Sequence, residues 1–290
     1  MELWFILALV VVLLWGLTGI FAKLSTPKLG VARVAVLIAV VEGTMYFLAF
    51  CYWRGNLFIA FKDGVLATGA CVLGVIAYLC FFESIMDGQI AIVGTISAAY
   101  PALTVVGALL LLSETLTASQ AIGLAATVGG VIALSYEPHP GSQHAMPRRS
   151  VIFALLALML WGLWGLTSKM AVDRIGPGNI LGFYAIAATS VGMVYAWFRR
   201  VRLWRLGTDS PPRAAWALGA TGLACSASGT FAYSFALEKG AAALVVPISS
   251  AYPLVTVVLA VALLHEKLSW FHVIALVAVL IGMIVIGITA

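Results

Sequence analysis

Long apolar blocks, separated by short polar or glycine-rich breaks, run along the whole chain. Most blocks hold about 18–22 residues, the length that an α-helix needs to cross a hydrocarbon layer of roughly 30 Å. The weak alternation over about ten residues that is typical of a membrane β-barrel does not occur in the sequence. Breaks at Gly, Pro and charge clusters predict ten membrane-spanning helices. We expect them at residues 3–22, 34–53, 64–84, 90–112, 118–136, 151–170, 179–198, 213–236, 241–263 and 270–288.

Composition supports an all-α membrane protein. Hydrophobic residues make up 63% of the 290 residues, charged residues 9%, and the mean hydropathy is +1.11. A soluble domain carries roughly a quarter charged residues. The net charge of +5 lies in short loops and at helix ends, which indicates membrane topology and not nucleic-acid binding. The first block lacks a basic leader and a small-residue cleavage site, so we interpret it as a helix and not as a signal peptide.

The second half of the chain repeats motifs of the first half in the same order. The matching pairs are LLWGLTGIFAKL (13–24) with MLWGLWGLTSKM (159–170), AYLCFFES (77–84) with AYSFALEK (232–239), and ISAAYPALT (96–104) with ISSAYPLVT (248–256). The third pair is followed by LLSETL in the first half and LLHEKL in the second. Four matches in one order indicate an internal duplication.

The duplication predicts two five-helix repeats, residues 1–136 and 151–290, joined by a linker at 137–150 that contains three prolines. Five is an odd number, so the second repeat must cross the membrane in the opposite direction. Two inverted repeats around a midplane site are the architecture of many secondary transporters.

A proline lies in the middle of the fourth and the ninth predicted helices. Pro101 and Pro253 lack an N–H group, which leaves the carbonyls of Ser97 and Ser249 without their helical partner. The polar residues of this region share one helix face in each half: Ser97, Tyr100 and Thr104 in the first, and Ser249, Tyr252 and Thr256 in the second. We expect the two polar faces to oppose each other across a central, partly hydrated cavity. The alternative is a packed kink in which the hydroxyls bond back to the backbone.

Three charged residues lie in or at the ends of predicted helices. Glu42 is in the middle of the second one, where a carboxylate is costly and is by default a proton-coupling group or a substrate ligand. The alternative is a neutral glutamic acid held by a hydrogen bond between helices, and the matching region AIAATSVGMVYA (185–196) has no Glu. Lys23 and Lys169 end the first helix of each half, where they attract an anionic substrate or extend to the membrane surface.

Aromatic residues repeat at matching places and complete the predicted binding site. They either line the cavity or anchor helices at the membrane boundary. The predicted substrate-binding residues are Trp15, Tyr78, Ser97, Tyr100, Pro101, Thr104, Trp161, Trp164, Tyr233, Ser249, Tyr252, Pro253 and Thr256. The histidines and cysteines have no metal-ligand spacing, and neither a catalytic triad nor a phosphate loop occurs. We therefore expect neither an enzyme nor a protein with a metal or cofactor.

The constellation of motifs resembles the EamA-type branch of the drug/metabolite transporter superfamily. The residues that carry the resemblance are W-G…K at the end of the first helix of each half, the mid-helix proline, and a Glu with Leu two residues later in SETL and HEKL. A Gly-containing fifth helix, AIGLAATVGGVIAL, completes the first half. The family usually has Leu-Gly-Glu where this chain has Ser113-Glu114 and His265-Glu266. The resemblance implies a ten-helix transporter in a prokaryotic plasma membrane, often an exporter of amino acids or other small metabolites.

The orientation of the chain has two conflicting indications. Eleven Lys and Arg residues follow odd-numbered predicted helices and five follow even-numbered ones, which together make all 16. The positive-inside rule then places both termini outside, whereas the resemblance implies termini in the cytoplasm. Both indications place the termini on one side.

The sequence thus predicts a secondary transporter that exports small organic metabolites, such as amino acids, by alternating access. Its partners would be a small-molecule substrate and the lipid bilayer, without nucleic acid, and the protein would be a monomer or homodimer. The alternative is a membrane scaffold or receptor that transports nothing, although such a protein has no need of duplicated helix-breaking prolines.

Overall fold

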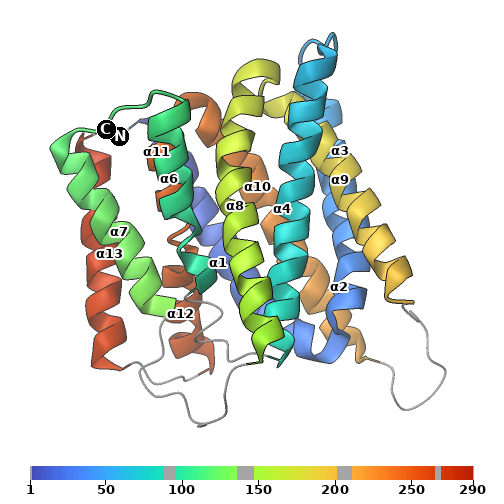
Figure 1. The fold of residues 1–290 in the computed structure, drawn as a ribbon. Helices are drawn as coiled ribbons and strands as arrows, with labels where there is room; N and C mark the ends of the chain where they lie inside the picture. Colours follow the sequence, from blue (N-terminus) through green and yellow to red (C-terminus); the bar gives the residue numbers. More distant parts are fainter. Residues whose placement is uncertain (1, 88–95, 136–146, 201–210, 265–268, 290) are drawn as a thin grey trace.

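The structure, a computed structural model, describes residues 2–87, 96–135, 147–200, 211–264 and 269–289. These residues form α-helices, one π-helical segment and their connections (Figure 1). Part of the linker predicted at 137–150, residues 137–146, lies outside the described residues. The elements are α1 (Leu3–Leu29), α2 (Val31–Leu37), η1 (Ile38–Glu42), α3 (Gly43–Trp53), α4 (Phe61–Asp87), α6 (Tyr100–Leu111), α7 (Ala118–Ser135), α8 (Arg148–Ile175), α9 (Pro177–Phe198), α10 (Arg213–Lys239), α11 (Ala242–Ser249), α12 (Tyr252–Leu264) and α13 (Trp270–Thr289).

Seven segments among the described residues are long and apolar enough to cross a membrane. They are Leu3–Leu29, Val31–Trp53, Phe61–Ser84, Arg148–Ile175, Pro177–Phe198, Ala242–Leu263 and Trp270–Thr289. Two shorter apolar helices cover Ile96–Leu111 and Ala118–Leu134. Helix α10 is 27 residues long and lies in the same bundle (Figure 1). The all-helical prediction is confirmed for the described residues.

Several helix bounds differ from those predicted. Helix α1 continues past residue 22 to Leu29, and only Gly30, at φ 77°, separates it from α2. The ninth predicted helix, 241–263, is two helices, because α11 ends at Ser249 and α12 begins at Tyr252. In the first half a turn at Ala99 likewise precedes α6. Each proline therefore lies in the first turn of a new helix, where its fixed φ fits and its missing N–H costs nothing.

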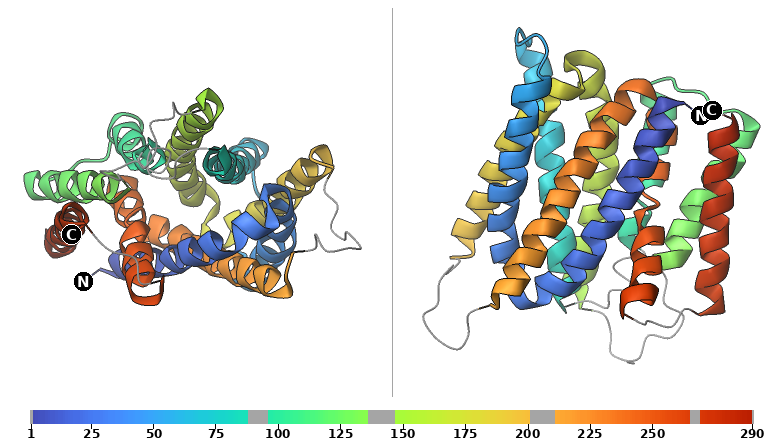
Figure 2. Two further views of the ribbon diagram at one scale, coloured as in Figure 1. Left: turned by 90° about the horizontal axis from the view of Figure 1, so that it is seen from below. Right: turned by 180° about the vertical axis from the view of Figure 1, so that it is seen from behind.

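The helices pair across the two halves of the chain. Helix α1 packs on α10, and α4 packs on α8, which is the corresponding pair. The segment α2–η1–α3 packs on α9, α6 on α11, and α7 on α13. In Figure 1, α1 runs away from the end of the bundle that carries both termini, whereas α8 runs toward it. Figure 2 shows the same bundle from below and from behind, with α7 and α13 together at one edge.

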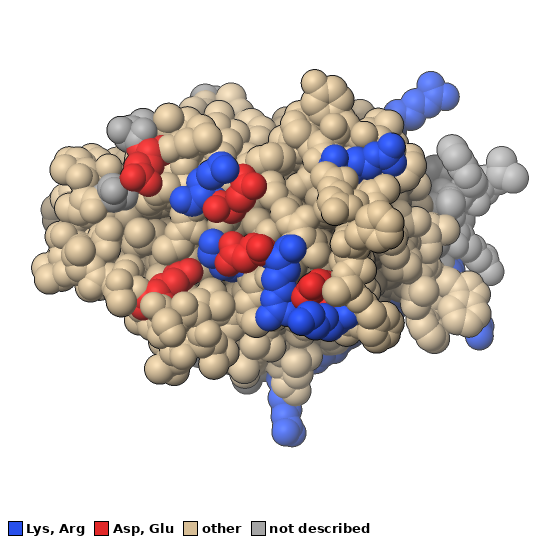
Figure 3. Space-filling view, turned by 90° about the horizontal axis from the view of Figure 1, so that it is seen from above, with Lys and Arg blue, Asp and Glu red and all other residues tan. Residues whose placement is uncertain are grey.

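The outside of the bundle is apolar along the helices and charged at the ends. Large exposed side chains include Phe61 at 89%, Leu110 at 75% and Phe198 at 71%. Such side chains favour contact with lipid, because water would not solvate them. On the face that carries the termini, acidic and basic side chains lie interspersed (Figure 3).

Candidate functional site

The π-helical segment η1 ends at Glu42, the carboxylate predicted to lie in the membrane. A π-helical turn adds one residue to a helical turn and occurs often at functional sites. The N–H of Gly43 donates to the carbonyl of Ile38, five residues back, which defines the widened turn. Glu42 is 4% exposed. The local backbone irregularity and the buried acid thus coincide.

Helix α9 explains why the widened turn is tolerated. The Thr189 hydroxyl donates to the carbonyl of Ala39, inside η1, at 3.3 Å. Gly43 lies directly against Thr189, so a Cβ at Gly43 would collide with the threonine hydroxyl. Gly192 lies in the same way against Ala35 and Ala39. Small residues on both segments let α9 approach the backbone of η1 and satisfy it.

Glu42 faces three polar side chains from neighbouring helices. Ser226 of α10 lies within hydrogen-bonding reach of its carboxylate. Tyr46 of α3 and Tyr78 of α4 lie close enough to interact electrostatically with it, and Tyr78 also reaches Ser226. The other carboxylate oxygen, Oε1, has no hydrogen-bond partner among the described residues. A buried oxygen without a partner is costly, so this atom is a candidate to bind a ligand or a proton.

An aromatic cluster adjoins Glu42 through Ser226. The indole N–H of Trp15 donates to the carbonyl of Ser226 at 3.3 Å. The Trp15 ring lies 6.0 Å from Trp164, 5.5 Å from Tyr233 and 6.1 Å from Tyr252, between centroids. Trp164 and Tyr233 stack at 4.9 Å with 18° between their planes. Four of the predicted binding residues, from four different helices, are therefore connected through Trp15.

Two glycines at matching places make room for the indoles. Gly74 lies against Trp164, and Gly229 lies against Trp15. Each glycine precedes its tyrosine by four residues (78 − 74 and 233 − 229). A larger side chain at either place would displace an indole from the cluster.

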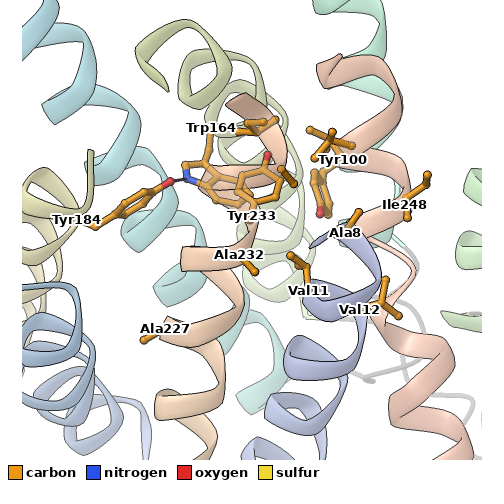
Figure 4. Close-up of a cluster of buried hydrophobic side chains, with 14 of the residues drawn as sticks. Ala8, Val11, Val12, Tyr100, Trp164, Tyr184, Ala227, Ala232, Tyr233 and Ile248 are labelled. Carbon is orange, nitrogen blue, oxygen red and sulfur yellow. Dashed lines mark hydrogen bonds between the residues drawn. The ribbon is translucent and has the colours of Figure 1, made fainter. Parts of the chain in front are cut away.

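The Trp164 indole is fixed by a hydrogen bond, while Tyr233 is not. Trp164 donates from its ring N–H to the hydroxyl of Tyr184 at 2.8 Å, and Ser168 lies 3.2 Å from the same hydroxyl. Figure 4 shows this bond, with the Tyr233 ring beside Trp164. The Tyr233 hydroxyl is fully buried and has no partner among the described residues. It is a second polar atom available to a ligand.

The remaining predicted aromatic residues form an adjacent group around Trp161. Its ring lies 6.4 Å from Tyr78 and 5.7 Å from Tyr100, between centroids. Tyr78 thereby connects this group to Glu42. The predicted aromatic residues thus lie near one another. Tyr46 and Ser226 were not among the predicted residues, because no repeated motif marks them.

The two predicted threonines lie in helix contacts. Thr104 donates to the carbonyl of Gly162 in α8 at 2.9 Å, and Thr256 donates to the carbonyl of Gly16 in α1 at 2.9 Å. Thr256 also lies 3.3 Å from the carbonyl of Tyr252. Each threonine thus joins the proline helix of one half to the first helix of the other. Both hydroxyls therefore bond to backbone carbonyls at helix contacts.

The two predicted serines lie just before the helix breaks. Ser249, the last residue of α11, is fully buried, and its hydroxyl has no partner among the described residues. Ser97 is also buried. Next to Ser249, the Ser250 hydroxyl donates to the carbonyl of Pro247 at 2.6 Å. The break therefore leaves the Ser249 hydroxyl as a third free polar atom in the core.

The two predicted lysines lie away from the cluster. Lys169 forms an ion pair with Asp173 at 2.8 Å and donates to the carbonyl of Leu237 at 2.8 Å. Lys23 lies on α1 and is not buried. The engaged ammonium group of Lys169 favours a structural role for this residue.

Two further glutamates hold helix ends. The carboxylate of Glu114 accepts the backbone N–H groups of Ala242 and Ala243, both at 2.8 Å, at the start of α11. Glu83 is buried and pairs with Arg149 at 2.6 Å and with Arg199 at 3.4 Å, while the Tyr195 hydroxyl also donates to it. Glu266 lies outside the described residues. Among the described residues, no group of three or more His, Cys, Asp or Glu side chains could hold a metal ion.

Comparison with known proteins agrees with the duplicated architecture. The family model described as "EamA-like transporter family" matches residues 2–136 and again residues 148–288. A stretch of 135 residues, 47% of this chain, is 30% identical to "Uncharacterized protein MJ1333.1" of Methanocaldococcus jannaschii and covers 98% of it. A relative that is about half as long therefore matches one half of this chain. A crystal structure of a protein that is 18% identical has a TM-score of 0.77, covering 99% of this chain and 97% of the other; it supports the fold.

Proposed function

The chain belongs to the EamA-like transporter family, and from this we propose that it is a secondary transporter which exports small organic metabolites, such as amino acids, by alternating access. Membership confirms the resemblance drawn from the repeated motifs and makes the chain a multi-pass membrane protein of the drug/metabolite type. The observation that carries the proposal is the buried carboxylate of Glu42, whose Oε1 has no hydrogen-bond partner among the described residues, next to a cluster of buried aromatic residues.

The proposed architecture is ten membrane-spanning helices in two inverted five-helix repeats, residues 1–136 and 151–290. It is supported by the cross-half pairing of α1 with α10 and of α4 with α8. The opposite directions of α1 and α8 in Figure 1 agree with inversion. Two inverted halves can rock against each other, so that outward-open and inward-open states become near-equivalent packings.

The proposed substrate site combines Glu42 with the aromatic cluster of Trp15, Trp164, Tyr233 and Tyr252. Tyr252, at the start of α12, connects the broken helix to this cluster, in keeping with transporters whose discontinuous helices bind substrate at the midplane. A site that is mostly aromatic with a few convergent polar atoms suits an amphipathic organic solute.

Glu42 is our candidate for proton coupling. The groups near it are Tyr46, Tyr78 and the hydroxyl of Ser226, and none of these is basic. Without a cationic partner, a carboxylate in the membrane gains or loses a proton as its surroundings change. We expect Glu42→Gln to fold normally and to lose transport driven by a pH gradient, because glutamine cannot exchange a proton.

The test is solute flux in proteoliposomes, with and without an imposed pH gradient. Radiolabelled amino acids are tried first, followed by a metabolite panel selected by the rise in melting temperature of the purified protein. Glu238→Gln is the matched control, since Glu238 holds the place of Glu83 in the other half and is partly exposed. The proposal is supported if wild type and Glu238→Gln both show pH-driven flux and Glu42→Gln shows none. Vesicles that seal against every solute would favour a scaffold or receptor instead.

The proposed orientation places both termini outside a prokaryotic plasma membrane. The termini lie at one end of the bundle (Figure 1), where Arg174 pairs with Asp63 and Lys239 pairs with Glu238. The opposite end carries most of the Lys and Arg residues, which the positive-inside rule assigns to the cytoplasm. A phosphatase fused to the C-terminus should be active, because it would lie outside the cell. An inactive phosphatase fusion, together with fluorescence from a fluorescent protein fused at the same place, would put the termini in the cytoplasm.

A further inference from the structure

Two carboxylates are buried in the described part of the chain, and only one of them has charged partners. Glu83 has two arginines within ion-pair distance. Glu42 has the Ser226 hydroxyl as a neutral partner for its carboxylate, and its Oε1 atom has no hydrogen-bond partner. Among the described residues, no Lys or Arg side chain forms an ion pair with Glu42. A buried carboxylate that lacks a protein cation is costly, so an incoming positive charge is favoured at Glu42.

Aromatic residues of several helices lie near this carboxylate. Tyr46 and Tyr78 lie beside Glu42, and Trp15 bonds to the backbone of Ser226, which reaches the carboxylate. Trp15 in turn contacts Trp164 and the rest of the aromatic cluster. Aromatic faces attract ammonium groups, most strongly where water is excluded.

Two other polar atoms of the core that lack a hydrogen-bond partner among the described residues are neutral. They are the hydroxyls of Tyr233 and Ser249, both fully buried. Neutral hydroxyls can bind a hydroxyl, carbonyl or amide group, but they do not balance a full negative charge. The ammonium group of Lys169, the predicted anion attractor, is already bound to Asp173 and Leu237. A zwitterion would therefore bring its carboxylate into a core without a cation to receive it.

We propose that this site selects organic ammonium compounds of net positive charge over zwitterions, with the ammonium at Glu42 and an apolar body among the aromatic rings. The inference rests on the proposed transport function and narrows its substrate class from metabolites in general to amines. The free hydroxyls then bind a neutral polar group on the substrate.

The experiment is equilibrium binding to the purified full-length protein in detergent. The ligand is radiolabelled phenethylamine, and the competitors are phenylalanine, 3-phenylpropionate and 2-phenylethanol, which have the same aromatic body and differ in charge. We expect saturable phenethylamine binding, with competition by the other three only at concentrations at least tenfold higher. Glu42→Gln should weaken phenethylamine binding at least tenfold, while Glu238→Gln should leave it unchanged. Trp15→Leu should weaken it about tenfold, as expected when a desolvated cation–π contact is lost.

Three outcomes would overturn the inference: no saturable phenethylamine binding up to millimolar concentration, phenylalanine competing at equal concentration, or full binding by Glu42→Gln. If Glu42→Gln does not fold, Trp15→Leu decides, because undiminished binding by that variant contradicts the aromatic contact. Flux assays separate this inference from the transport proposal. Phenethylamine binding without flux of any solute would support the ammonium site and refute the transport function. Flux of other solutes without amine binding would support the transport function and refute the ammonium site.

Discussion

The contact between Glu114 and α11 gives the sharpest test of how the two halves are held together. Glu114 follows α6 in the first half, and its two carboxylate oxygens accept the N–H groups of Ala242 and Ala243 at 2.8 Å each. The first N–H groups of a helix have no partner within it. Both alanines are fully buried, so water cannot easily replace the carboxylate. Helix α11 has only eight residues, and this anchor should therefore be essential for its position.

The expected cost follows from these two bonds. A hydrogen bond to a charged group contributes about 1.5–3 kcal/mol, and a negative charge at a helix N-terminus adds roughly 0.3–1 kcal/mol. Some of this loss is recovered when the freed N–H groups find water or shift. We therefore expect Glu114→Ala to lower the free energy of unfolding by about 2–4 kcal/mol. Glu114→Gln keeps one acceptor oxygen and should lose about half as much.

The assay is reversible unfolding with SDS in mixed micelles, followed by a thiol-reactive fluorophore. The buried thiols of Cys71 and Cys80 report unfolding. Glu238→Ala is the control, because Glu238 pairs only with its neighbour Lys239 at a partly exposed site, and it should cost less than about 1 kcal/mol. Equal losses in Glu114→Ala and Glu238→Ala would refute the anchoring role, and equal losses in Glu114→Ala and Glu114→Gln would refute the argument from two separate bonds.

Three further predictions use the same unfolding assay. Ser113 has φ 54°, a left-handed conformation that costs an L-residue about 1–2 kcal/mol, so Ser113→Gly should raise the free energy of unfolding by about 0.5–1 kcal/mol after the entropy of glycine is counted; a loss would contradict the strain. Thr104→Val and Thr256→Val each remove one cross-half hydrogen bond and should each lower the free energy of unfolding by about 0.5–1.5 kcal/mol. An unchanged free energy of unfolding in either variant would show that its hydrogen bond does not stabilise the protein. Glu83→Gln weakens a pair with the half-exposed Arg149 and should cost about 1–2 kcal/mol, with a double-mutant cycle against Arg149→Gln measuring the coupling; additive losses would mean that the pair contributes nothing.

The hydrophobic pattern is enough to predict the helical class and most of the helix positions. It misplaces ends where the chain departs from a simple apolar block. The polar stretch KLSTPKL is part of helix α1, although its composition predicts a loop. The helix ends at Leu29, because the next residue, Gly30, has a φ of 77° that a helix does not allow. The pattern also hides the break between α11 and α12, because apolar residues continue on both sides of Ser250 and Ala251.

The candidate site is only partly visible in the sequence, because its members come from distant helices. The duplicated motifs marked the tryptophans and tyrosines, which do contact one another. They also marked Thr104 and Thr256, whose hydroxyls bind carbonyls of the opposite half instead of opening a cavity. Ser226 carried no such mark, since it is one small polar residue among several in α10. Its role depends on tertiary packing that places it against Glu42.

Duplicated residues and unique residues have different roles in this molecule. Gly43 and Gly192 occupy matching places where α9 crosses the α2–η1–α3 segment, and each lies against the backbone of the other segment. The residue before each glycine differs, because Glu42 corresponds to Val191. Symmetric packing lets two inverted halves exchange equivalent contacts, so the repeated residues suit a rocking scaffold. A charge present in one half alone cannot be exchanged in this way. In the proposed transport cycle, Glu42 therefore keeps the same neighbours on α10 only if α1, α10 and the α2–η1–α3 segment move together. That group of helices, and not either sequence half, would then be the moving unit that we propose.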